Sequence, residues 1–214
     1  MNAIGVFGGT FAPIHHGHLR LAIEAREALG LDEVRLIPAA RPPLRAAPAI
    51  APARRLRWVK LAIGRERGLV ADGRELARRG PSYTIDTLAS LRAQFPRAAL
   101  CLLLGQDAAR QLPRWHRWRE LPDYAHLVLF ARPGQRPSLP AALAKRLRGR
   151  RARTAAELRR RPAGLWLRLA LPPLGISGSD VRRRLKDGLS VRGLVPDTVL
   201  ADFTRRDLEA WRRA

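Results

Sequence analysis

Residues 4–18 read IGVFGGTFAPIHHGH. The apolar start predicts a short buried strand over residues 4–7, and the two glycines after it allow a sharp turn and a close approach of the backbone to a ligand. Apolar residues then recur with helical spacing as far as Leu29, where Gly30 supplies a stop. A strand, a glycine turn and a helix start direct free backbone N–H groups and the helix dipole toward an anion. The stretch therefore predicts a phosphate-binding site at the end of the first strand.

Two features of the sequence favour anionic ligands. His15 and His18 stand at the expected helix start and add hydrogen-bond donors that can become cationic. Lys and Arg total 41 against 18 Asp and Glu, which gives a formal net charge of +23 and favours anionic partners. Nearly all these cations are arginine, and the accompanying Ala and Pro bias is typical of a GC-rich genome. The charge alone therefore does not predict a nucleic-acid partner.

Length and composition set the class of protein. A chain of 214 residues with 46% hydrophobic content suffices for one α/β domain with a substantial core. The single cysteine, Cys101, excludes a disulfide framework and fits a reducing compartment. The N-terminus lacks the features of a signal peptide, and no run approaches the roughly 20 apolar residues of a membrane span. We expect a cytoplasmic protein without a membrane partner.

Strands and helices alternate along the chain. Further strands are predicted over residues 34–37, 69–71, 100–104, 126–130 and 166–171. Helices are predicted over residues 54–63, from an N-cap at Ser82 to Pro96, over a basic segment at 145–161, over 181–186 and from Asp197 onward. A proline-rich loop covers residues 38–53. The alternation predicts an α/β fold with a doubly wound parallel sheet, as a single domain over residues 1–214 with a small helical part from about residue 175.

Glycine- or serine-bearing turns follow three of the predicted strands, at residues 8–10, 105–107 and 176–179. In a parallel sheet these turns converge on one edge, which predicts a single active site there. The chain has no P-loop, no dinucleotide-binding glycine fingerprint, no cysteine or histidine metal motif and no nucleophile elbow. Direct displacement without a covalent intermediate is the chemistry that remains.

Four motifs, in order, resemble those of a known family. The segment GGTFAPIHHGH at residues 8–18 resembles the signature of the H-x-G-H nucleotidylyltransferases. The blocks ELARRGPSYTIDTL at 75–88, GQD at 105–107 with Trp115 and Trp118 after it, and ISGSDVR at 176–182 with LVP at 194–196 are similar to bacterial nicotinate-nucleotide adenylyltransferases. The resemblance runs from residue 4 to about residue 200, and it implies a Rossmann-like fold.

The resemblance implies that ATP and nicotinate mononucleotide react to give nicotinate adenine dinucleotide and pyrophosphate in NAD biosynthesis. It implies catalytic roles for His15, His18 and Thr10, and ATP-binding roles for Gly8, Gly9, Thr10, His15, His18, Gly105, Asp107, Ile176, Ser177, Ser179 and Arg182. It implies that Arg45, Tyr83, Thr84 and Trp115 bind the mononucleotide. Mg²⁺ would come with ATP and bridge phosphate oxygens, so no metal site made of protein side chains is expected.

Alternatives remain open at this point. Helix capping is the alternative for Asp107, Ser177 and Ser179, and a place in the core is the alternative for Trp115 and Trp118. Ala12 stands where the family usually has Asp, Leu44-Arg45 stand where it has His-Lys, and Gly178 and Ser179 are milder departures. The same chemistry on nicotinamide mononucleotide or phosphopantetheine is one rival function, and a nucleotide- or RNA-binding relative without catalysis is another. The oligomeric state, monomer or homodimer, stays undecided.

Overall fold

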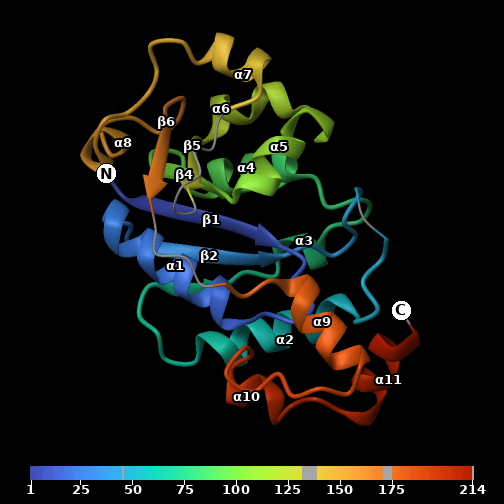
Figure 1. Ribbon diagram of the computed structural model, residues 1–214. Coiled ribbons are helices and arrows are strands. Elements are labelled where there is room, and N and C mark those ends of the chain that lie inside the picture. Colours follow the sequence, from blue (N-terminus) through green and yellow to red (C-terminus); the bar gives the residue numbers. More distant parts are fainter. Residues whose placement is uncertain (45, 132–138, 171–174, 214) are drawn as a thin grey trace.

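The computed structural model describes residues 1–44, 46–131, 139–170 and 175–213 (Figure 1). Within this part of the chain, six strands form one parallel sheet in the order β3-β2-β1-β4-β5-β6. The strands are β1 (Ala3–Gly9), β2 (Glu33–Pro38), β3 (Leu69–Ala71), β4 (Ala99–Leu104), β5 (His126–Ala131) and β6 (Trp166–Ala170). The predicted doubly wound, Rossmann-like α/β fold is confirmed.

The strand order reverses between β1 and β4. Chain connections run from β1 outward to β2 and β3, then return to β4 and continue outward to β5 and β6. Ala3 pairs with Ala99 on one side of β1, and Gly9 pairs with Pro38 on the other. In such sheets ligands bind beside the carboxyl ends of the two strands at the reversal. The end of β1 and the end of β4 therefore mark the expected crevice.

Helices cover both faces of the sheet. They are α1 (His16–Leu29), α2 (Pro52–Ile63), α3 (Arg74–Ala77), α4 (Thr84–Gln94), α5 (Gln106–Gln111), α6 (Leu121–Tyr124), α7 (Ala141–Arg146), α8 (Ala155–Leu158), α9 (Gly178–Lys186), α10 (Asp197–Leu200) and α11 (Arg205–Arg213), with short 3₁₀ turns at Leu112–Arg114 and Trp118–Glu120. Across the described residues, no helix has the length and apolarity that a membrane crossing requires.

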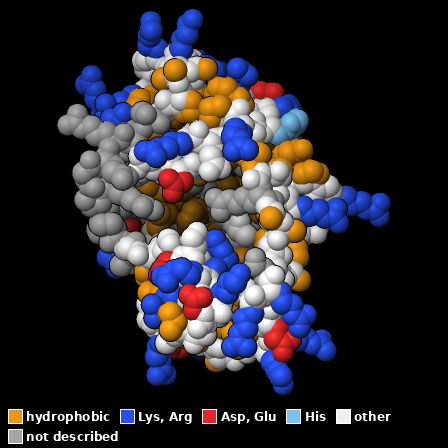
Figure 2. All heavy atoms as spheres, turned by 45° about the vertical axis from the view of Figure 1, so that its right-hand side comes forward, with side chains coloured by type: hydrophobic (Ala, Val, Ile, Leu, Met, Phe, Trp, Pro, Cys, Tyr) orange, Lys and Arg blue, Asp and Glu red, His pale blue; other side chains and the backbone are white. Residues whose placement is uncertain are grey.

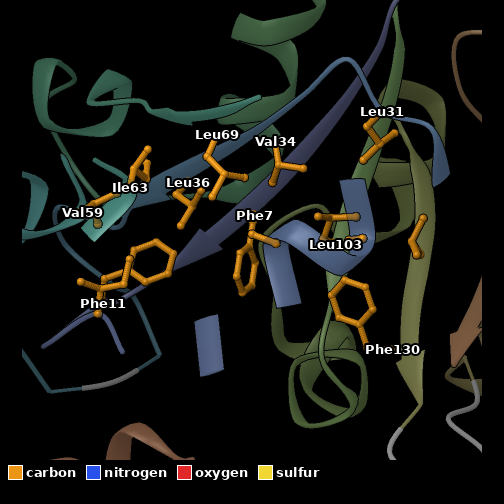
Figure 3. Packing of buried hydrophobic residues seen from close by; sticks show 14 of the residues in the cluster. Phe7, Phe11, Leu31, Val34, Leu36, Val59, Ile63, Leu69, Leu103 and Phe130 are labelled. Atoms are coloured by element: carbon orange, nitrogen blue, oxygen red, sulfur yellow. The ribbon is translucent and has the colours of Figure 1, made fainter. Parts of the chain in front are cut away.

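The core has two parts, one on each face of the sheet. Every residue of β4 is buried, and Cys101 and Leu103 join the cluster beneath α1, α2 and α9, whereas Leu100 and Leu102 join the cluster beneath α4 and α6. Figure 3 shows the first cluster, where Phe7 of β1 lies among side chains from β2, β4 and β5. Alternation along strands that are covered on both faces explains the continuous apolar runs in the sequence.

Three local predictions were wrong. The segment 145–161 is not one helix, because α7 ends at Arg146, Gly149 takes a left-handed φ of +72°, and Arg151 pairs with Trp166 beside β6. Ser82 is not the N-cap of α4. That position belongs to Tyr83, while the Ser82 hydroxyl accepts a hydrogen bond from the Arg41 N–H. The expected terminal helix is divided into α10 and α11.

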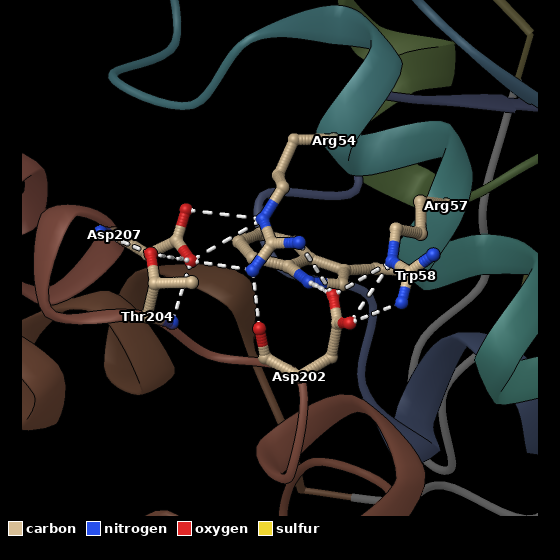
Figure 4. A network of polar contacts seen from close by, with 6 residues as sticks. All are labelled: Arg54, Arg57, Trp58, Asp202, Thr204 and Asp207. Carbon is tan, nitrogen blue, oxygen red and sulfur yellow. Dashed lines mark hydrogen bonds and ion pairs between the residues drawn. The ribbon is translucent and has the colours of Figure 1, made fainter.

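The C-terminal segment is fastened to α2 by a polar network (Figure 4). Arg54 donates to the Asp207 carboxylate at 2.8 Å and pairs with Asp202 at 2.7 Å. Trp58 donates its indole N–H to Asp202 at 3.1 Å, and its ring stacks on Trp211 with centroids 5.6 Å apart. This network joins residues about 150 positions apart in the chain.

Candidate active site

A cleft of about 360 Å³ opens beside the carboxyl ends of β1 and β4. Its lining comes mainly from those two strands, the segments 10–13 and 39–44, the starts of α4 and α9, and α5 with the residues after it; α1 adds His18 and α3 adds Glu75. Figure 2 shows the hollow on the side of the molecule toward which the strands point, with hydrophobic side chains at its bottom. The cleft therefore lies at the point where the strand order reverses, as the sequence predicted.

Most of the predicted site residues meet in this cleft. Those that line it are Gly8, Gly9, Thr10, His18, Tyr83, Thr84, Gly105, Trp115, Ser179 and Arg182. The side chains of His15, Asp107, Ile176 and Ser177 lie outside the lining, and Arg45 lies outside the described residues. The structure thus brings together residues from four separate sequence motifs.

Gly8 and Gly9 were predicted as a turn after the first strand, but they are the last two residues of β1, and the turn that follows them is shaped by Phe11. A Cβ at Gly9 would lie 2.9 Å from two atoms of the Phe11 ring, so only glycine fits there, whereas a Cβ at Gly8 would meet nothing within 4 Å. Phe11 has a φ of 48°, an uncommon conformation for a bulky residue. Its buried ring makes edge contacts with Phe7, at 5.7 Å between centroids, and with His18, at 5.0 Å. The turn is held from behind and open on the cleft side.

The two histidines of the H-x-G-H motif stack on each other. Their ring centroids are 3.6 Å apart, with His18 in the cleft lining and His15 buried behind it. A Cβ at Gly17 would lie 3.0 Å from the His15 Nδ1 and 3.1 Å from the Ile176 carbonyl oxygen. The motif needs glycine at this position because α1 and the segment before α9 approach closely there.

Both imidazoles are neutral near pH 7 in the unliganded protein. Burial, reinforced by the Arg182 charge, lowers the pKa of His15 to about 4. Burial together with His15 and Arg182 holds the pKa of His18 well below its usual 6.5. The His18 Nδ1 accepts a hydrogen bond from the His15 backbone N–H at 3.3 Å. The proton of neutral His18 is therefore on Nε2, which makes that atom a hydrogen-bond donor.

The start of α9 adds a cation to the same wall. Arg182 donates to the Ser179 hydroxyl at 3.2 Å, and its charge acts on the buried His15. Ser177 caps the helix, since its hydroxyl accepts a hydrogen bond from the Asp180 N–H at 3.0 Å. The capping role, which was the alternative for Ser177, is thus present. Asp107 is exposed on the first turn of α5, after the N-cap residue Gly105.

The opposite wall is aromatic. Tyr83 stacks on His116 with ring centroids 4.3 Å apart, and Trp115 lies beside them in the lining. Trp118 is buried in the core, as its alternative interpretation had it. Sequence reasoning missed His116, although its place between two tryptophans in the WHRW segment was the available signal.

A buried carboxylate and an arginine brace the start of α4. Glu75 accepts a hydrogen bond from the Thr87 hydroxyl at 2.6 Å, and burial raises the pKa of this carboxyl group. Arg78 donates to the Tyr83 carbonyl at 3.3 Å. No side chain caps the N-terminus of α4, so its first-turn N–H groups are not taken by a capping hydroxyl or carboxylate. Sequence reasoning missed these roles of Glu75 and Thr87, as well as the cleft position of Gln111.

The donor set bears on how a metal ion could be held. In the part of the chain that the structure describes, no three His, Cys, Asp or Glu side chains gather closely enough to hold an ion. Glu75 supplies a carboxylate to the cleft lining, and Thr87 already donates a hydrogen bond to it. A divalent ion carried by phosphate oxygens fits this arrangement better than an ion in a protein cage.

Comparison with known proteins shows which proteins this chain is similar to. The family profile described as cytidylyltransferase-like matches residues 6–184. A protein of Halorhodospira halophila named "Probable nicotinate-nucleotide adenylyltransferase" is 51% identical over 199 residues, covering 93% of this chain and 91% of the relative. A protein of Aeromonas salmonicida with the same name is 48% identical over 204 residues, covering 95% and 94%.

A solved structure shares the fold. It is the Plasmodium falciparum nicotinic acid mononucleotide adenylyltransferase complexed with NaAD, with a TM-score of 0.68, 13% identity and coverage of 94% of each chain. The relatives of about half-identical sequence extend the likeness over nearly the whole length. The chain therefore belongs to the cytidylyltransferase-like family and, within it, to the nicotinate-nucleotide adenylyltransferases.

Proposed function

We propose that this protein transfers the adenylyl group of ATP to nicotinate mononucleotide, which yields nicotinate adenine dinucleotide and pyrophosphate in NAD biosynthesis. A phosphate oxygen of the mononucleotide attacks the α-phosphorus of ATP, and the bond from that phosphorus to the pyrophosphate oxygen breaks. The observation that carries the proposal is a single cleft with donors suited to phosphates on one wall and aromatic rings on the other.

The triphosphate is assigned to the wall formed by the turn after β1 and the start of α9. Gly8 and Gly9 at the end of β1 and Thr10 after them offer backbone groups, and His18 offers its Nε2–H as a donor. His15 supports His18 by ring stacking and by its backbone N–H, which donates to the His18 Nδ1. Ser179 and Arg182 add a hydroxyl and a cation for the pyrophosphate end, with Ser177 and Ile176 shaping the turn before them. Donors placed where charge grows in the transition state lower the barrier.

A divalent metal ion enters with ATP as part of the substrate, and we infer Mg²⁺. Its charge would offset the negative charge of the phosphates. The chain's own contribution is the neutral His18 donor and the Arg182 cation, which face the same phosphates without competing for the ion. Gly105 and the exposed Asp107 are assigned to the adenosine, with the carboxylate accepting from ribose hydroxyls.

The nicotinate ring is assigned to the aromatic wall. The face of Tyr83 on which His116 now stacks is suited to a flat pyridine ring, and Trp115 extends this surface. The carboxylate of the ring is assigned to the uncapped N–H groups at the start of α4, near Thr84. Arg45 is proposed to meet the phosphate of the mononucleotide.

Pyrophosphate release with ATP and either mononucleotide tests the proposal. We expect nicotinate mononucleotide to be preferred over nicotinamide mononucleotide, because a carboxylate gains more than an amide from helix N–H groups. Tyr83→Leu should raise the KM for the mononucleotide and leave the KM for ATP nearly unchanged. The other tyrosine of the chain, Tyr124, does not line the cleft, so Tyr124→Leu is the matched control. A preference for the amide, or tight RNA binding without turnover, would contradict the proposal.

A further inference from the structure

Arg55 is a buried arginine directly behind the cleft wall. It lies on α2 with 0% of its surface exposed, and it does not line the cleft. Its guanidinium donates to three backbone carbonyls: to Thr10 at 2.6 Å, to Ile50 at 3.0 Å and to Ala40 at 3.4 Å. These acceptors belong to the turn after β1 and to the two ends of the segment 40–50. One side chain therefore joins the phosphate turn to the loop that forms the cleft rim.

Within the described part of the chain, the charge of Arg55 has no contact partner of opposite sign. Among the described residues no carboxylate forms an ion pair with it, and Glu75 acts on it only through space. Its neighbours on the same helix differ, since Arg54 and Arg57 both pair with Asp202. Burial lowers the pKa of Arg55 to about 10, so the group is still cationic at neutral pH. An unneutralised buried charge makes a field that water screens weakly.

The turn that Arg55 contacts contains a strained backbone conformation. Phe11, the next residue after the bonded Thr10 carbonyl, has a φ of 48°. Such a conformation persists in a bulky residue when the surrounding structure enforces it. The bond from Arg55 fixes the carbonyl at the entry to this strained position, and the ring contacts of Phe11 fix its other side.

We propose that Arg55 is a positioning residue for adenylyl transfer. Its three-pronged contact sets the Thr10 turn relative to the 40–50 loop, and its charge adds positive potential beneath the triphosphate. The inference rests on the proposed function, because it concerns the wall to which that function assigns the phosphates. Arg55 touches no substrate and acts through the position of the turn and through its charge.

Two substitutions separate the contact from the charge. Arg55→Met removes both and keeps a similar length, whereas Arg55→Lys keeps the charge but has one ammonium group for three separated carbonyls. Arg57→Met is the matched control, since it removes a cation from the exposed side of the same helix, away from the cleft. Circular dichroism and thermal melts establish that each variant is folded at the assay temperature.

Steady-state kinetics should show a lower kcat together with unequal changes in the KM values for the two substrates. We expect Arg55→Met to lower kcat by roughly 10- to 100-fold and to raise the KM for ATP, as for a misplaced catalytic wall. The KM for the mononucleotide should change less than the KM for ATP, because the aromatic wall is held by other contacts and, of the residues assigned to the mononucleotide, only Arg45 belongs to the 40–50 loop. Arg55→Lys should fall between the wild type and Arg55→Met. A folded Arg55→Met with the kcat of the wild type would overturn the inference, as would an equal loss in Arg57→Met.

Hydrogen exchange keeps the test independent of turnover and of the folding of Arg55→Met. In Arg55→Lys, amides of residues 8–12 and 39–50 should exchange faster than in the wild type, while those of β5 stay unchanged. Unaltered exchange and unaltered kcat in this variant would overturn the inference even if Arg55→Met fails to fold. A wild-type protein without turnover would instead count against the proposed function, and the exchange result would still decide the role of Arg55.

Discussion

At the scale of single residues, His18 does its work as a neutral donor. Its ring is fixed by Phe11 on one side and His15 on the other, and its Nδ1 is occupied by a backbone N–H. Only Nε2–H is left to meet a ligand, so the donor is oriented before the substrate binds. Sequence reasoning identified both histidines but did not predict that His18 lines the cleft while His15 lies buried behind it. The stacking that places them so depends on tertiary contacts.

Removing the His18 imidazole should therefore cost one preorganised donor. We expect His18→Ala to lower kcat by roughly 10²-fold or more, with a smaller change in the KM for ATP. His16→Ala is the control, because His16 lies two positions before His18 but is absent from the cleft lining, and the kcat of this variant should stay near that of the wild type. Pyrophosphate release measures both variants. Equal losses in the two would indicate a general disturbance of α1.

The pKa of His15 makes a second prediction at this scale. The folded-state pKa of about 4 lies below the usual 6.5, so the unfolded chain binds the proton more readily between these values. Stability from this residue is therefore present above pH 6.5 and is lost as the pH falls toward 4. Between pH 7 and 5 the loss should be about 2 kcal/mol. Urea unfolding of the wild type and His15→Gln checks this, since the variant should lose less stability over that interval.

At the scale of elements, apolar runs predicted the strands well. Runs such as that of β4 are covered on both faces, and their sequence leaves little choice. The basic segment 145–161 was predicted poorly, because its helical spacing takes no account of Gly149 or of the pairing of Arg151 with Trp166. The N-cap of α4 was predicted wrongly because the Ser82 hydroxyl accepts a hydrogen bond from the Arg41 backbone N–H instead of from an N–H group of its own helix.

The junction of α1 with the segment before α9 yields a prediction for an element contact. Gly17→Ala places a methyl group 3.1 Å from the Ile176 carbonyl and 3.0 Å from the His15 ring, so the two elements must move apart. Helix propensity alone would make this change stabilising. We expect instead a lower melting temperature and a kcat reduced by roughly 10-fold. A raised melting temperature with unchanged kcat would show that the two elements separate at no cost to the site.

At the scale of the whole molecule, the sequence predicted the sheet class and the edge that carries the site. Turns that follow different strands had to converge once the sheet was parallel, and the cleft unites Gly8, Gly105 and Ser179 as that logic required. Nothing in the sequence indicated that the C-terminal segment packs on α2. The pairing of Arg54 with Asp207 joins residues 153 positions apart, and one sequence holds no signal for such a contact.

The polar network of Arg54, Trp58, Asp202 and Asp207 forms a C-terminal clamp on α2. This clamp should contribute to global stability rather than to catalysis. Although burial alone would raise it, hydrogen bonds from Arg54 and Thr204 hold the pKa of Asp207 below its usual value, which marks a stabilised carboxylate. Asp207→Asn removes one of the two carboxylates that pair with the half-buried Arg54, and Asp202 remains, so the change should cost roughly 1–2 kcal/mol of unfolding free energy. Glu209→Gln on α11 removes two ion pairs with the exposed Arg205 and Arg213 and should cost less than about 0.5 kcal/mol. Urea unfolding of both variants, with kcat measured where each is folded, distinguishes the two roles. A large fall in the kcat of folded Asp207→Asn would show that the clamp reaches the cleft through α2, where Arg55 follows Arg54 directly.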